Sequence, residues 1–162
     1  MTRAVPDLSL ADFHDGALSA RAAFSSELMS GLQDYGFVVL RDHGVPIDLL
    51  DAAYAAAEQV FALPEDAKRR YAAGMRGYTP FGVEHAKDSG QPDLKEFWQV
   101  GHTPAPGEVI DEPFDPNVWP AEVPDFRVAV GELFDRLNDT GMTVLQALAP
   151  ELGLTTHWFD DK

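Results

Sequence analysis

Metal-ligating side chains gather near the middle of the sequence. His85, Asp88 and Asp93 offer one imidazole and two carboxylates within a short span, a donor set that suits a divalent metal ion. A solvated polar loop explains the same three residues, and we favour that explanation. His43 is a further candidate ligand, but it lies in an Asp-His-Gly turn, where an imidazole more often bonds backbone groups. No histidine of the chain is followed two residues later by Asp or Glu.

Titratable and aromatic side chains flank these donors. Glu84 and Glu96 could form a general acid and base pair. Tyr78, Phe81 and Trp98 could line a substrate pocket, because aromatic rings give an apolar wall and Tyr and Trp add a hydrogen-bonding tip. Packing in a core explains these rings equally well, so both roles stay open.

Composition restricts the function classes. A chain of 162 residues with 45% hydrophobic side chains can form one domain with its own core. Its formal charge of −15 repels phosphate backbones and anionic lipids, so we expect neither nucleic acid nor membrane as a partner. Cysteine is absent, which excludes a thiolate metal site and a cysteine nucleophile. The first ten residues lack the apolar segment of a secretory signal, and we expect a cytoplasmic protein.

The first half of the sequence predicts helices around one strand. Apolar residues at helical spacing predict a helix over residues 17–35, ended by Gly36, and a second over residues 46–62 with Tyr54 on its buried face. A short third helix follows, with acidic residues in its first turn and basic residues in its last. The apolar, β-branched run at residues 37–40 predicts a buried, central strand.

The second half predicts a long loop and then a long helix. Residues 74–120 are rich in Gly and Pro, which excludes long helices, and only residues 94–100 predict a strand, with Leu94, Glu96 and Trp98 on one face. The aromatic residues of this segment favour a packed and functional loop. A helix of about 25 residues is predicted from Pro124 to near Pro150. Its expected buried stripe is Phe126, Val130, Leu133, Leu137, Val144 and Leu148.

Three segments match one enzyme family in order. Residues 36–45, G-F-V-V-L-R-D-H-G-V, are like its G-F-x-x-x-x-x-H-G-V strand and turn, and residues 61–68, F-A-L-P-E-D-A-K, are like its F-x-L-P-x-E-x-K. The third match joins Gly77-Tyr78 to the D-L-K-E of residues 93–96. Over its whole length the chain resembles the N-terminal region of the isopenicillin N synthase-like iron(II) and 2-oxoglutarate dependent oxygenases.

The resemblance implies that the metal site lies beyond this chain. Family members are about twice this length and continue, after an L-G-L-x-x-x-x-F segment like residues 152–159, into a double-stranded β-helix that holds iron and 2-oxoglutarate. Their H-x-D motif, distal histidine and R-x-S belong to that part. The resemblance therefore assigns no catalytic, metal-binding or cofactor-binding residue here. In this family the region of residues 77–101 lies over the mouth of the active site, which makes Tyr78, Glu84 and Trp98 our candidate substrate-binding residues.

We therefore expect an α+β fold. It would be the helical and short-strand N-terminal half of a jelly-roll (double-stranded β-helix) oxygenase, with one long scaffold helix and with the β-helix core largely missing. Residues 1–162 would form the non-haem dioxygenase N-terminal domain. By resemblance the full-length enzyme uses Fe(II) and 2-oxoglutarate for hydroxylation, desaturation or ring closure of a small molecule. This chain alone should bind neither and should be inactive.

Two rival hypotheses belong to other classes. The chain could be a non-catalytic binding or regulatory module derived from such an enzyme, forming a dimer through the surface that the jelly roll normally covers. Exposed apolar area separates this module from an enzyme fragment, because a fragment leaves a bare patch that a monomer rarely tolerates. The other rival is an unrelated metal hydrolase built on His85, Asp88 and Asp93.

Overall fold

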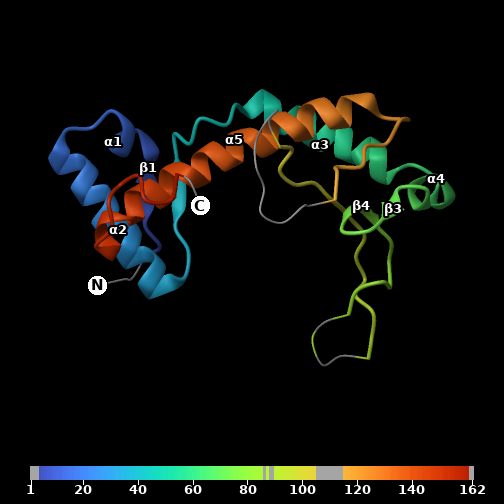
Figure 1. Ribbon diagram of the computed structural model, residues 1–162, viewed down its shortest axis with the longest axis horizontal. Coiled ribbons are helices and arrows are strands. Elements are labelled where there is room, and N and C mark those ends of the chain that lie inside the picture. The colour runs from blue at the N-terminus through green and yellow to red at the C-terminus, as the bar shows by residue number, and fades with distance from the viewer. Residues whose placement is uncertain (1–3, 86, 88–89, 105–114, 161–162) are drawn as a thin grey trace. The chain divides into compact units, whose positions relative to one another are not determined.

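The computed structural model describes residues 4–85, 87, 90–104 and 115–160, and the chain divides into two compact units, several of whose elements are labelled in Figure 1. We call Met1–Val45 with Arg136–Lys162 the terminal unit, and Pro46–Asp135 the inserted unit. The predicted long helix is confirmed as α5, Pro124–Leu148, 25 residues. Its first turns belong to the inserted unit, and its residues from Arg136 onward belong to the terminal unit.

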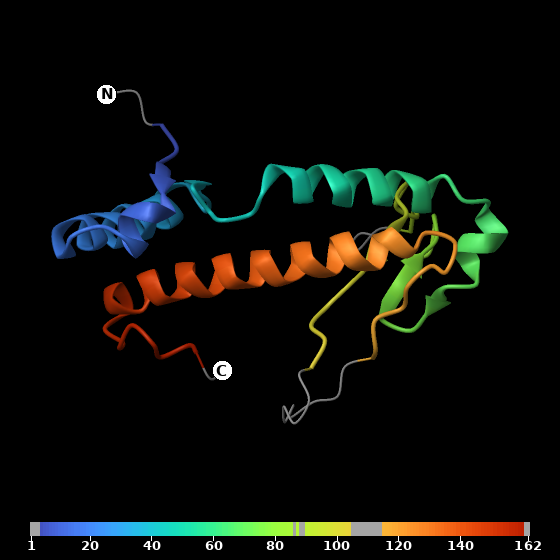
Figure 2. The same ribbon diagram turned by 90° about the horizontal axis from the view of Figure 1, so that it is seen from above.

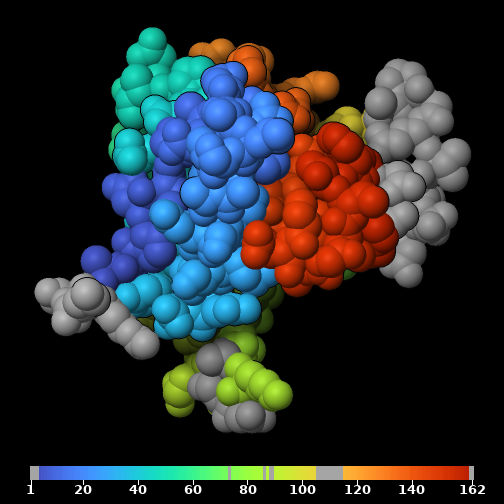
Figure 3. Space-filling view, turned by 90° about the vertical axis from the view of Figure 1, so that its left-hand side faces the viewer, coloured from blue at the N-terminus to red at the C-terminus, as the bar shows by residue number. Residues whose placement is uncertain are grey.

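The terminal unit packs helices against a two-stranded parallel sheet. Its elements are β1 (Asp7–Ser9), α1 (Leu10–His14), α2 (Leu18–Tyr35), β2 (Val39–Arg41), the end of α5, and a 3-10 helix, η1 (Pro150–Leu152). Its core joins Leu10 and Leu28 to Phe24 and Ala147, all almost fully buried. Figure 3 shows the blue N-terminal residues beside the red C-terminal residues. The helix predicted over residues 17–35 is confirmed, and Gly36 ends it with a φ of 79° while donating its N–H to the Leu32 carbonyl.

The strand predicted over residues 37–40 is present, but its expected central position is wrong. Among the described residues β2 pairs only with β1, with Leu8 opposite Leu40. Phe37 is 56% exposed and Val39 47% exposed. The partner strand lies near the N-terminus, where three residues carry too little pattern to predict a strand.

The inserted unit combines helices with a three-stranded antiparallel sheet. Its elements are α3 (Ile47–Phe61), α4 (Glu65–Arg69), β3 (Ala72–Ala73), β4 (Arg76–Thr79), β5 (Phe97–Gln99) and the first turns of α5. The sheet has the order β3-β4-β5, and β3 and β4 were not predicted. Gly77 is required in β4, because its φ is 86° and a Cβ would lie 2.4 Å from the Tyr71 carbonyl oxygen.

The core of this unit lies where α3 meets the start of α5, two helices that Figure 2 shows side by side. Ala56 and Val60 of α3 pack with Val123 and Phe126. Two expectations about burial are wrong. Tyr54 is 72% exposed because the buried stripe of α3 runs through Ala53, Ala56 and Val60, and Leu137 of α5 is 53% exposed. The strand predicted over residues 94–100 is shorter than expected, because β5 begins only at Phe97 and leaves Leu94 outside it, 94% exposed.

No helix among the described residues is both long and apolar enough to cross a membrane.

Candidate functional site

Tyr78 and Trp98 lie side by side on the β4–β5 hairpin. They are direct partners in the antiparallel register, and their ring centroids are 6.2 Å apart. Cross-strand partners share one face of a sheet. Trp98 also contacts Tyr71 and Phe126, at centroid distances of 5.5 and 5.6 Å. Its indole Nε1 donates to the Val118 carbonyl at 3.0 Å, so the Trp98 ring is held on both sides.

A buried polar network holds Tyr78 to α4. Tyr78 is 2% exposed, and its hydroxyl bonds to Glu96 and, at 3.0 Å, to Glu65. Lys68 of α4 is 5% exposed, and its Nζ donates to Glu96 Oε2 at 2.7 Å and to the Phe61 carbonyl at 3.2 Å. The Glu96 carboxylate therefore joins α4, β4 and the residue before β5 in one cross-link.

Burial and hydrogen bonding set the charge states in this network. Burial alone would raise the pKa of Glu96, but its bonds to Lys68 and Tyr78 outweigh burial and hold that pKa below its ordinary value. Burial and the hydrogen bonds to Glu96 and Glu65 raise the pKa of Tyr78 far above its ordinary value. The phenol thus stays a neutral donor, and Glu96 stays an ionised acceptor.

The network unites the motifs on which the family resemblance depends. Lys68 ends the F-A-L-P-E-D-A-K segment, Tyr78 follows Gly77 in the Gly-Tyr pair, and Glu96 ends D-L-K-E. In the structure these three side chains bond to one another. Their contacts explain the motifs as one structural cross-link rather than as a catalytic group.

Glu84 differs from the other two candidate residues because its side chain is 47% exposed. Lys95 Nζ lies 3.0 Å from Glu84 and 3.2 Å from Asp93, and the hydrogen bonds to Glu84 and then Asp93 raise the pKa of Lys95. The Asp93 amide donates to the Glu84 carbonyl at 2.8 Å. Glu84 and Glu96 bond to different lysines, so the geometry gives no support to an acid and base pair.

The histidines do not assemble a metal centre within the part of the chain that the structure describes. His43 Nδ1 accepts the Val45 amide at 3.2 Å, as expected for a turn histidine. His85 forms an isolated β-bridge with Pro92, and Asp88 lies outside the described residues. No group of three or more His, Cys, Asp and Glu side chains suited to a metal occurs among the described residues. These donors do not fit an iron site of two histidines and a carboxylate.

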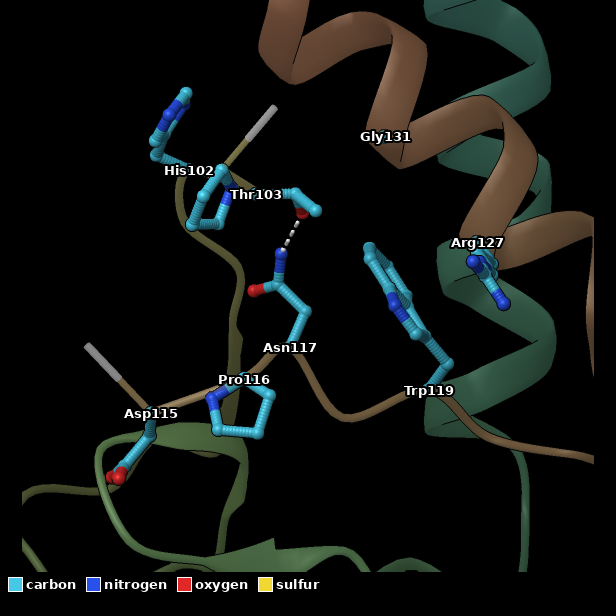
Figure 4. Close-up of a pocket in the computed structure, with 9 residues that line it drawn as sticks. His102, Thr103, Asp115, Pro116, Asn117, Trp119, Arg127 and Gly131 are labelled. Carbon is cyan, nitrogen blue, oxygen red and sulfur yellow. Dashed lines mark hydrogen bonds between the residues drawn. The ribbon is translucent and has the colours of Figure 1, made fainter. Parts of the chain in front are cut away.

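A cavity of about 520 Å³ opens elsewhere in the inserted unit (Figure 4). Trp119, Arg127, Asn117 and Thr103 are among the residues that line it, whereas Tyr78, Glu84 and Trp98 are not. The sequence indicated only that Trp119 belongs to a packed aromatic segment. Arg127 belongs to none of the sequence motifs, so only the structure shows that it lines this cavity.

Comparisons with known proteins agree on one family. A family model described as "non-haem dioxygenase in morphine synthesis N-terminal" matches residues 5–122. The 2-oxoglutarate-dependent dioxygenase traH of Penicillium crustosum is 30% identical over 160 residues, covering 92% of this chain and 49% of the relative. A solved 2OG-Fe(II) oxygenase family protein from Caulobacter crescentus is 38% identical with a TM-score of 0.82, and the match covers 98% of this chain and 52% of that one.

A second solved structure includes the cosubstrate. This full-length Neurospora crassa protein, in complex with alpha-KG (2-oxoglutarate), is 25% identical with a TM-score of 0.78, and the match covers 96% of this chain and 50% of that protein. The chain thus spans about half the length of the curated relatives it matches. Because the family model covers most of the sequence and the same relationship appears in the fold, the chain belongs to the non-haem 2-oxoglutarate and iron(II) dependent oxygenases.

Proposed function

We propose that this chain is the N-terminal portion of an oxygenase that hydroxylates, desaturates or closes a ring in a small molecule. Family membership supports the reaction class, and the match to about half of each relative supports the assignment as a portion. In this proposal residues 1–162 are the N-terminal domain, and the jelly-roll core follows them.

In this proposal iron and 2-oxoglutarate bind in the jelly-roll core. The histidines and carboxylates that the structure describes do not converge as an iron site needs, and no H-x-D or H-x-E occurs in the sequence. The chain by itself therefore neither holds the metal nor catalyses the reaction.

The contribution of this chain is one wall of the substrate pocket. Trp98 supplies its apolar, fixed part, because its indole N–H bonds to Val118. Tyr78, which is 2% exposed, packs against Trp98 and holds it in place through the network. Glu84 supplies the polar contact, because its half-exposed carboxylate can reach a bound molecule. The cross-link at Glu96 is the observation that carries the proposal, since it makes this wall rigid before substrate arrives.

Sequencing the coding region beyond Lys162 tests the proposal directly. An open frame that continues into H-x-D, a distal histidine and R-x-S is the expected result. A stop codon after Lys162 would overturn it and would favour the non-catalytic module.

The exposed apolar side chains in each unit are what an enzyme fragment without its jelly roll leaves bare, and the module accounts for them only if a second copy covers them. Examples are Leu18, Phe37 and Leu152 in the terminal unit and Ile47, Met75 and Leu94 in the inserted unit. A second copy could cover such residues as well as a jelly roll could. Sedimentation velocity separates the two: the enzyme-portion proposal predicts no defined dimer of the isolated chain, and the module predicts a stoichiometric one.

A further inference from the structure

The cavity of Figure 4 has a wall that is fixed by hydrogen bonds. Asn117 Oδ1 accepts the Gly101 amide at 2.9 Å, and its Nδ2 donates to the Gly101 carbonyl at 2.7 Å and to Thr103 Oγ1 at 3.0 Å. The last bond is the dashed line of Figure 4. Opposite this wall, the Trp119 ring packs edge-on against Phe126 at a centroid distance of 6.0 Å. The cavity volume of about 520 Å³ is in the range of small-molecule sites.

Two hydrogen-bond donors of this cavity have no protein partner among the described residues: the Arg127 guanidinium and the Trp119 indole N–H. Every other arginine that the structure describes is bonded or paired. An arginine without a partner among the described residues is unexpected in a chain with 27 acidic and 12 basic residues. Among the described residues that line the cavity, Asp115 is the one carboxylate, and it accepts the Met75 amide at 3.2 Å and points away from Trp119 and Arg127 in Figure 4.

Gly131 leaves the helical side of the cavity open. It lies in the interior of α5, where glycine is a poor helix former, and a Cβ at this position would meet no atom within 4 Å. Gly141 of the same helix is equally unobstructed and does not line the cavity. The two glycines therefore provide a matched pair for testing what fills the space.

We propose that this cavity binds a small organic acid. The apolar body of the acid packs on Trp119, and its carboxylate accepts hydrogen bonds from Arg127, whose planar guanidinium matches a carboxylate with two parallel donors. The Trp119 N–H supplies a further donor to the same ligand. This site is separate from the wall formed by Tyr78, Glu84 and Trp98, and its binding does not depend on the proposed oxygenase function.

Titration of the full chain with 4-phenylbutyrate and with its uncharged amide tests the proposal. The chain has three tryptophans, so three indole N–H signals are followed by NMR, and Trp119→Phe assigns one of them. The acid should shift the Trp119 signal saturably and leave the Trp158 signal in place. The amide should bind at least about tenfold more weakly, because it cannot form the charged pair.

Four variants refine this titration. Arg127→Gln should weaken binding of the acid by about tenfold or more, and Arg127→Lys should retain part of the affinity. Gly131→Leu should abolish binding while keeping the dispersed NMR spectrum of a folded chain, and Gly141→Leu should bind as the unchanged chain does. Equal binding of acid and amide, an unmoved Trp119 signal, or normal binding by Gly131→Leu would each overturn the proposal.

Discussion

Lys68 is a charged side chain that the fold buries almost completely, and its partner Glu96 is only 16% exposed. Lys68→Met removes the cation but leaves the carboxylate in place, so the free energy of unfolding should fall by about 3 kcal/mol. Arg69→Met is the matched control, because the neighbouring Arg69 pairs with Glu65 at the surface, 2.8 Å away, and its loss should cost less than about 1 kcal/mol. Urea melts measure both. Equal midpoints for the two variants would contradict the structural role of the network.

Glu96 should also contribute to acid unfolding. Its pKa in the folded chain lies below its ordinary value of 4.5. The stability it adds is therefore present above about pH 4.5 and is lost as the pH falls through the folded pKa. Urea midpoints recorded from roughly pH 6 to 3 should fall less steeply for Glu96→Gln than for the unchanged chain. Glu122→Gln is the control, because the pKa of Glu122 is also lowered, by Tyr71 foremost, but on the surface. An equal change of slope in both variants would contradict a special contribution from the bonds of Glu96 to Lys68 and Tyr78.

Glu84 is the candidate contact that can be changed without touching the network. In a version of the protein that includes the jelly roll, Glu84→Gln should reduce substrate turnover and leave iron and 2-oxoglutarate affinity intact, because those ligands are held elsewhere. Decarboxylation of 2-oxoglutarate without substrate should continue. Asp93→Asn is the control, because Asp93 also pairs with Lys95 but is not a candidate substrate contact. Lost iron binding, or unchanged turnover of every substrate tried, would leave Glu84 as a surface loop residue.

At the scale of elements, the first turns of α5 should be stabilised by one buried face. Phe126 is 3% exposed and packs on Trp98 and Trp119, so Phe126→Ala should lower the free energy of unfolding by about 3 to 5 kcal/mol. Val128 lies two residues further and is 69% exposed. Val128→Ala should change the urea midpoint little. A similar loss of stability in both variants would contradict the assignment of the buried face of α5.

Helices were predictable because their pattern is local. The bounds of α2, α3 and α5 follow the apolar period, the capping Gly36 and the nearby prolines within a few residues. The apolar period of a helix does not show where along its length the elements that pack against it end. Leu137 therefore continues the stripe of Phe126 in the sequence but lies exposed in the structure.

The strands were less predictable because their partners are distant in sequence. β1 pairs with residues beyond the two intervening helices α1 and α2, and β3 and β4 are too short to show alternation. The same limit applied to the site. The sequence identified Tyr78 and Trp98 as notable rings, but only the register placed them opposite each other, and only the fold brought Lys68 to Glu96.

For the whole molecule, we predict that the chain binds Fe(II) and 2-oxoglutarate no better than background. The physical reason is that the donors of a facial triad do not come together in the described residues. Calorimetry under anaerobic conditions measures this. A stoichiometric heat with micromolar affinity would contradict this prediction and would point to His85 or His102 as a metal ligand.

The division of the chain into a terminal and an inserted unit also orders its biosynthesis. A growing polypeptide that has reached Asp135 contains every residue of the inserted unit, so this unit can fold while synthesis continues. The terminal unit has to wait, because Phe24 and Leu28 pack against Ala147, Val144 and Leu148, which are made after the whole inserted unit. Of the two units, the one whose translation begins first is thus the one that finishes folding last, and until then its apolar helix face is open to chaperones and to aggregation.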